Sequence, residues 1–128
     1  MKGIIITNNK LVYEKYKDSR EISFLENHTF LDILKFTRNK VHIGHKLYTH
    51  PLSGSIKPNE TPYKSIIISK EKSSIDVKSI SIIEESILTS VKFLDNYPTP
   101  KWNEKILKDF RTIDLSFIEN VILKVSNL

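Results

Sequence analysis

The sequence predicts one α/β domain over residues 1–128, with helices on both faces of a mostly parallel four-stranded sheet. Two short β-branched runs, at residues 2–7 (KGIIIT) and 64–69 (KSIIIS), are typical of buried strands. Elsewhere, apolar residues recur at helical spacing. Strands that alternate with helices in this way indicate a three-layer sandwich of the Rossmann or flavodoxin-like kind, here with C-terminal helices added.

The opening segment alternates strands with a short helix. Residues 2–7 form the first predicted strand, and the Asn8-Asn9 pair can turn the chain and cap a helix over residues 10–17. Residues 21–26 (EISFLE) alternate in polarity and are predicted as a second strand, parallel to the first.

A longer helix is predicted over residues 29–43. Thr29 and Asp32 resemble a capping pair at its start, and Gly44 suits the position just beyond its end. Residues 46–49 (KLYT) are predicted as a short third strand that leads into a long loop.

The C-terminal half is predicted to be helical after the fourth strand. An apolar stripe marks a helix near residues 76–96, which the sequence Tyr-Pro-Thr-Pro ends. Thr99 is predicted to cap the next helix, with Pro100 at its first position. A further helix is predicted over residues 114–125. The direction of the fourth strand stays open, because its long connection suits either a wide hairpin or a parallel crossover.

That connection is the chemically richest part of the chain. Residues 42–65 hold three of the four histidines, three of the five prolines and two of the three glycines. Proline fixes φ and lowers the entropy of the unfolded segment, so the loop is held in few conformations. Because functional groups often lie on loops that a rigid scaffold positions, the sequence predicts that the protein acts here.

The predicted binding residues come from this loop and from the end of the first strand. In open α/β sheets, ligands bind outside the carboxyl ends of the strands, where Asn8 and His50 are expected to share one crevice. The full predicted ligand-binding set is Asn8, Asn9, Thr49, His50, Ser53, Gly54, Ser55, Lys57, Asn59, Glu60 and Tyr63.

Two kinds of ion site compete with simpler explanations. Ser53-Gly54-Ser55 with Lys57 could bind an anion through backbone N–H groups and a positive charge, or could merely form a turn. His42, His45 and His50 are close in sequence, but no carboxylate lies at a matching interval. A capping or buried role explains these histidines more simply than a metal site, and no metal is predicted.

Catalysis is a further alternative. His50, Glu60, Tyr63 and Lys64 could supply a general acid and a general base if they converge. No nucleophile-elbow motif is present, and three glycines cannot form a dinucleotide-binding or P-loop motif. No cofactor is therefore predicted.

Composition narrows the class of protein further. The absence of cysteine excludes disulfides, thiolate nucleophiles and Cys-ligated metals. The net charge is +5, but only three of the twenty basic residues are arginine, so nucleic acid is not expected as a partner. No apolar run approaches the roughly 20 residues of a membrane span, and the first residues do not resemble a signal peptide. A cytoplasmic protein without membrane contact is expected.

Several segments together resemble the GrdX family. They are residues 6–9 (ITNN), 49–55 (THPLSGS), 57–64 (KPNETPYK), 81–84 (SIIE) and 113–115 (IDL), so the likeness covers nearly the whole chain. Members of this family are small proteins encoded beside glycine reductase genes in anaerobic, amino-acid-fermenting bacteria.

The resemblance implies an accessory role around glycine, sarcosine or betaine reductase, whose components are the partners it suggests. It supplies no catalytic residues to transfer, and a chain without cysteine cannot be a redox carrier there. An assembly, maturation or regulatory role is expected, with a partner or a small anionic ligand bound through residues 49–64. The alternative is an enzyme that acts on a small phosphorylated or carboxylated metabolite using His50, Lys57 and Tyr63.

Overall fold

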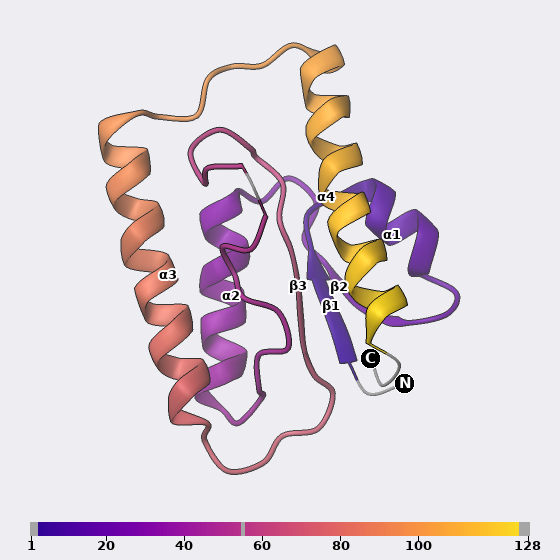
Figure 1. The fold of residues 1–128 in the computed structure, drawn as a ribbon, viewed down its shortest axis with the longest axis vertical. Coiled ribbons are helices and arrows are strands. Elements are labelled where there is room, and N and C mark those ends of the chain that lie inside the picture. The colour runs from indigo at the N-terminus through magenta and orange to yellow at the C-terminus, as the bar shows by residue number, and fades with distance from the viewer. Residues whose placement is uncertain (1–2, 55, 126–128) are drawn as a thin grey trace.

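The computed structural model describes residues 3–54 and 56–125, which form three strands and four helices (Figure 1). In chain order these are β1 (Gly3–Thr7), α1 (Lys10–Tyr16), β2 (Glu21–Phe24), α2 (Phe30–His42), β3 (Ser65–Ser69), α3 (Val77–Asn96) and α4 (Glu104–Lys124). None of the described helices combines the length and the apolar character needed to cross a membrane.

The sheet is mixed, with the strand order β2-β1-β3. β1 lies at its centre, parallel to β2 and antiparallel to β3, so that Ile5 pairs with Ile22 on one side and with Ile67 on the other. Every residue of β1 and β3 is buried, which explains why both strands are nearly continuous isoleucine runs.

Helices cover both faces of the sheet. α2 packs on one face with α3 stacked against it, while α1 and α4 lie on the opposite face (Figure 1). Alternate side chains of β1 and β3 divide between the two faces, as the period of a strand requires. The cluster toward α2 and α3 includes Ile4, Ile6, Ile66 and Ile68. The cluster toward α1 and α4 includes Ile5, Ile67, Val12 and Ile118.

The α/β class is confirmed, but the predicted mostly parallel, four-stranded, Rossmann or flavodoxin-like sheet is wrong. Residues 46–49 form no strand, although an isolated antiparallel bridge joins Leu47 to Ile68 and backbone hydrogen bonds join Lys46 to Ser69 and Tyr48 to Ile67. Two N–H groups of the segment bond to side-chain hydroxyls: that of Lys46 donates to Ser69 Oγ, and that of Leu47 donates to Ser79 Oγ of α3. The bridge is antiparallel, so the chain at Leu47 runs in the opposite direction to β3 and the predicted alternative of a parallel crossover is wrong.

The predicted capping residues of α1 and α2 are confirmed. Asn9 caps α1, and Thr29 with Asp32 forms a capping box at the start of α2. Gly44 follows α2 with φ of +113°, a conformation that favours glycine.

The predicted helix starting after Thr99 and its separate successor at 114–125 are wrong, because α4 is one continuous helix. Its cap is Asn103, whose Oδ1 accepts a hydrogen bond from the backbone N–H of Ile106 at 3.0 Å. Pro100 consequently lies in the α3–α4 connection.

Candidate functional site

The antiparallel pairing of β3 determines what meets at the carboxyl end of β1. Thr7, the last residue of β1, pairs with Ser65, the first residue of β3. The Asn8-Asn9 pair and Lys64 therefore meet at one end of the sheet, although they are far apart in sequence. α4 crosses this end and adds Arg111 and Asp114.

Asn8 joins three separate segments. Its Nδ2 donates to the backbone carbonyls of His28 and Pro62, both at 2.8 Å, and its Oδ1 accepts from the backbone N–H of Lys64 at 3.0 Å. The side chain is buried, and these bonds use its amide on the protein itself. Asn8 thus fastens the end of the 49–64 loop to the connection between β2 and α2.

Asn9 has a different role, although it is the next residue. Its Oδ1 accepts from the backbone N–H of Leu11, which is the cap predicted from the sequence. Its Nδ2 donates to the carbonyl of Arg111 at 2.8 Å and to Asp114 Oδ2 at 3.0 Å. One fully buried side chain therefore caps α1 and docks α4 against it.

Asp114 is the centre of a buried polar network. Ser65 Oγ donates to its Oδ2 at 2.7 Å, and Ser65 Oγ also lies 2.7 Å from Thr7 Oγ1. Burial raises the pKa of the Asp114 carboxyl, while the hydrogen bonds from Asn9 and Ser65 and the charge of Lys64 act in the opposite direction. Burial is the larger effect, so the pKa of the Asp114 carboxyl lies above its ordinary value although its partners oppose the shift.

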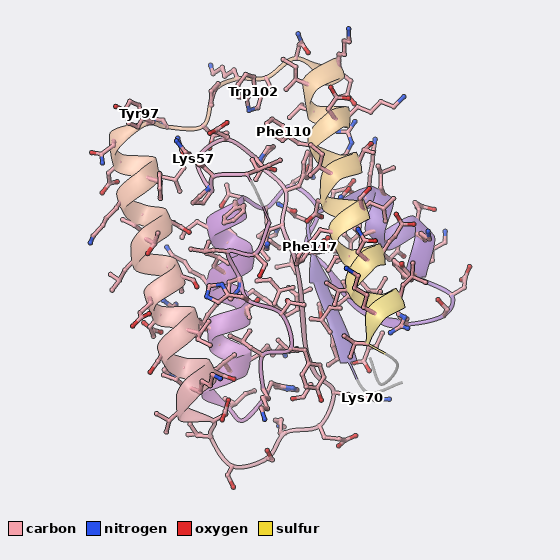
Figure 2. All side chains as sticks on the ribbon, in the orientation of Figure 1. Lys57, Lys70, Tyr97, Trp102, Phe110 and Phe117 are labelled. Carbon is pink, nitrogen blue, oxygen red and sulfur yellow. The ribbon has the colours of Figure 1, made fainter. Side chains whose placement is uncertain are left out.

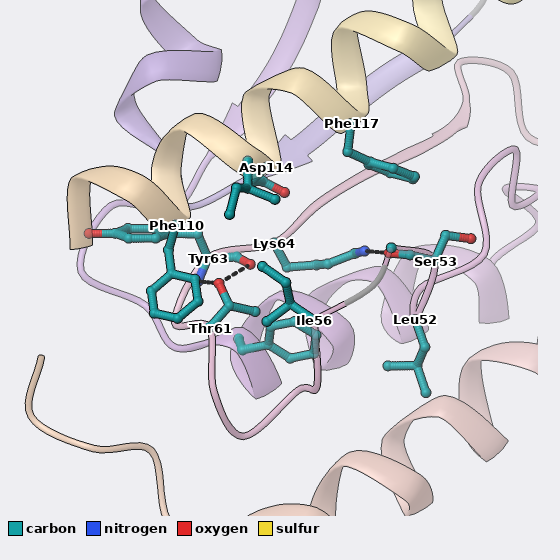
Figure 3. A pocket seen from close by; sticks show the side chains of 12 residues that line it. Leu52, Ser53, Ile56, Thr61, Tyr63, Lys64, Phe110, Asp114 and Phe117 are labelled. Atoms are coloured by element: carbon teal, nitrogen blue, oxygen red, sulfur yellow. Dashed lines mark hydrogen bonds between the residues drawn. The ribbon is translucent and has the colours of Figure 1, made fainter. Parts of the chain in front are cut away.

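Lys64 is the second buried charge at this end of the sheet. Only 4% of the residue is exposed, and its Nζ donates to the carbonyl of Ser53 at 2.9 Å (Figure 3). The ammonium also lies 4.9 Å from the ring centroid of Phe117. Burial lowers the pKa of Lys64 to about 8, and the charge of Asp114 partly offsets this effect.

A small cavity of about 50 Å³ lies between the loop and α4, and both charged residues line it (Figure 3). Three of the predicted binding residues, Ser53, Gly54 and Tyr63, also line this cavity. Its apolar walls are Phe30, Leu52, Ile56, Phe110, Ile113 and Phe117. We call it the Lys64 cavity.

A wider crevice opens at the carboxyl ends of β1 and β2, where an α/β sheet is expected to bind ligands. Asn8, Tyr63 and Arg111 lie on its walls. The guanidinium of Arg111 is buried, donates to the Tyr63 hydroxyl at 2.8 Å and pairs with Glu104. Its Nε has no hydrogen-bond partner among the residues that the structure describes.

Thr49 and His50 lie apart from these pockets, in a groove beside the start of α3. Thr49 Oγ1 accepts from the backbone N–H of Ile67, and the exposed His50 accepts from the backbone N–H of Leu52 through Nδ1. The expected crevice shared by Asn8 and His50 is not formed.

The remaining histidines of the loop region have local partners. His45 is buried with its Nδ1 2.7 Å from the carbonyl of Ser69, and His42 contacts Glu84 at 3.2 Å. Within residues 3–54 and 56–125, no group of three metal-ligating side chains is assembled.

The outer part of the loop carries the last predicted residues. Lys57 and Glu60 are exposed and line none of the three pockets. Asn59 is buried, and its Oδ1 has no hydrogen-bond partner within the described parts of the chain. The backbone carbonyl of Glu60 accepts a hydrogen bond from the indole of Trp102 at 2.7 Å. Ser55 lies outside the described residues.

The predicted set is therefore divided among three pockets and an outer surface, and sequence reasoning assigned no role to Asp114 or Arg111. One signal was available for Asp114. Phe110, Asp114 and Ile118 recur at intervals of four, which places the aspartate on the apolar face of a single helix. An acid on that face indicates a buried partner.

Comparison with known proteins identifies a family. The family described as GrdX-like protein matches residues 4–123. No curated protein and no solved structure matches the chain. Because the match covers nearly all of its length, the chain belongs to the GrdX-like protein family.

Proposed function

We propose that this GrdX-like protein is a non-catalytic accessory protein of glycine, sarcosine or betaine reductase. In this proposal it binds a reductase component through the outer surface of the loop of residues 49–64. Family membership supports the association with the reductase, and the construction of the loop supports the binding mode. The observation that carries the binding mode is the way this long loop is fastened to the rest of the fold.

Three side chains hold the loop from beneath or from its side. Asn8 binds the backbone of Pro62 and Lys64, Lys64 binds the carbonyl of Ser53, and Trp102 binds the carbonyl of Glu60. A loop that is ordered before binding loses little conformational entropy when a partner docks. The hydrogen bonds thus make the loop a suitable surface for a protein partner.

Two basic side chains are exposed on the fastened loop. His50 and Lys57 are exposed, and neither forms an ion pair with any described residue. Figure 2 shows Lys57 at the same end of the molecule as Trp102, whereas Lys70 lies at the opposite end. An exposed ammonium on an ordered loop can attract an acidic surface and orient it as it docks.

The enzyme alternative receives less support from the geometry. His50 lies in the groove beside α3, Tyr63 contacts Arg111 on the other side of the loop, and Lys57 lines none of these pockets. Acid–base catalysis requires its groups within hydrogen-bond reach of one substrate. These three side chains do not converge on one pocket, so the accessory function has the stronger support.

The test is direct binding to purified reductase components, measured by biolayer interferometry. Wild type is compared with a variant that carries His50→Ala and Lys57→Ala, and with Lys70→Ala as a matched surface control. We expect at least about tenfold weaker binding for the double variant and unchanged binding for the control. All the substituted residues are exposed, so changes in stability should stay within about 0.5 kcal/mol.

Two results would count against this proposal. One is that no component binds the wild type, and the other is that the double variant binds as tightly as the control.

A further inference from the structure

The Lys64 cavity is lined by one basic and one acidic side chain that do not contact each other. Lys64 and Asp114 both line the cavity and both are buried. They are close enough for each to affect the pKa of the other, yet no ion pair joins them in the described structure. Buried charges normally have a direct partner, because the loss of hydration is costly.

Both groups also keep hydrogen-bonding capacity. An ammonium has three donors, and among the described residues Lys64 gives one of them to an acceptor, the carbonyl of Ser53. The described hydrogen bonds to Asp114, from Asn9 and Ser65, both end on Oδ2. A carboxylate can accept about four hydrogen bonds, so the two described side-chain bonds do not exhaust the acceptor capacity of Asp114.

The size of the cavity restricts what can use these groups. Its volume is about 50 Å³, and a single water needs roughly 10–15 Å³ on the same scale. The cavity therefore has room for roughly three to five non-hydrogen atoms. The aromatic and aliphatic walls keep the local dielectric low, which strengthens any charge interaction made inside.

We propose that the Lys64 cavity binds a small zwitterion of the α-amino acid class. Its carboxylate lies on the Lys64 ammonium, and its ammonium group lies on the Asp114 carboxylate. A simple anion would be attracted by Lys64 but repelled by Asp114, and a simple cation would meet the reverse. Only a molecule that carries both charges satisfies both residues. This site is the inner wall of the loop, so the inference does not depend on reductase binding at the outer surface.

The experiment is an NMR titration of the ¹⁵N-labelled wild-type protein. Glycine serves as the smallest zwitterion, acetate and methylammonium carry one charge each, and leucine is too large for the cavity. We expect saturable shifts for glycine at the amides of Ser53, Lys64 and Asp114, with at least about tenfold weaker binding of acetate and methylammonium. Leucine should leave these amides unshifted.

Two variants separate the roles of the charges. Lys64→Met keeps the length of the side chain in an apolar cavity and should weaken glycine binding at least about tenfold. Lys70→Met, an exposed change at the opposite end of the molecule, should leave glycine binding unaltered. Asp114→Asn should remove the preference for glycine over acetate.

If a variant does not fold, the titrations of the wild-type protein are sufficient to test the proposal. The proposal is overturned if glycine gives no saturable shift up to ~50 mM, or if acetate binds as tightly as glycine. Equal glycine affinity in wild type and Lys64→Met also overturns it.

Discussion

Neighbouring residues of identical type perform different tasks at the end of β1. Asn8 links loops, with one partner 54 residues away, whereas Asn9 caps α1 and contacts α4 more than 100 residues away. The capping role follows from a local pattern and was predicted. The long-range bonds were not, because nothing in the sequence near an asparagine specifies which distant carbonyl it will meet.

Replacement of Asn8 by alanine should destabilise the protein by about 3 kcal/mol. The change leaves the carbonyls of His28 and Pro62 and the N–H of Lys64 without their buried partner, and each such group carries a desolvation penalty. Urea unfolding monitored by circular dichroism measures the loss. Asn120→Ala, an exposed change in α4, is the control and should alter the free energy of unfolding by less than about 0.5 kcal/mol. Equal effects of the two changes would contradict the role assigned to Asn8.

Lys64 should make stability depend on pH in the alkaline range. Its pKa is about 8 in the folded protein and near 10.5 when unfolded, so between these values the unfolded chain binds the extra proton. Stability therefore rises as pH increases from 8 toward 10.5, and the full penalty of burying the charge is present below pH 8. The contribution is on the order of a few kcal/mol.

The measurement compares wild type with Lys64→Met by urea unfolding at intervals from pH 7 to pH 10. The free energy of unfolding of Lys64→Met should exceed that of wild type by less as pH rises, because only the wild type buries an ammonium that loses its charge. Lys57→Met, which removes an exposed ammonium, is the control for the loss of a lysine from the loop. A difference between wild type and Lys64→Met that is independent of pH would contradict the assignment.

At the scale of elements, two glycines with nearly the same backbone conformation differ in their surroundings. Gly44 and Gly54 have φ of +113° and +114°. A Cβ on Gly44 would lie 2.4 Å from the carbonyl oxygen of Ser73, whereas a Cβ on Gly54 would meet nothing within 4 Å. Both positions disfavour alanine through φ, but only Gly44 also needs the space, because the segment before α3 packs against the end of α2.

Gly44→Ala should therefore destabilise the protein more than Gly54→Ala does, by about 1–3 kcal/mol. The φ penalty is common to both variants, so the difference isolates the contact with Ser73. Thermal and urea unfolding of the pair provide the measurement. Similar losses for the two variants would mean that the backbone at Ser73 moves aside easily.

The elements that sequence reasoning predicted well are those with local signals. The capping box at Thr29 and the glycine after α2 lie within the segments that they define. In the predicted strand at 46–49, the N–H groups of Lys46 and Leu47 bond to the hydroxyls of Ser69 and Ser79, which are remote in sequence, and no regular ladder forms. Thr99 and Pro100 have the residue types of a helix start, but the residue that caps α4 is Asn103.

At the scale of the whole molecule, the direction of β3 determines which residues meet at the site. The sequence predicted that Asn8 and His50 meet beside parallel strands. Because β3 runs antiparallel to β1, the residue that lies beside Asn8 is Lys64, at the far end of the loop. Several loop residues line the pockets, but which of them face inward depends on pairing that periodicity does not reveal.

The hydrogen bond between Trp102 and Glu60 has a practical consequence, because Trp102 is the only tryptophan in the sequence. Its fluorescence reports on a single place, the junction of the loop with the α3–α4 connection. Local opening of that junction requires less free energy than global unfolding, so the emission should shift to the red at a lower urea concentration than that at which helicity is lost. Asn8→Ala should widen this gap, and coincident transitions in both proteins would show that loop and core unfold together. The emission wavelength of Trp102 thus reports whether the loop is packed against the α3–α4 connection.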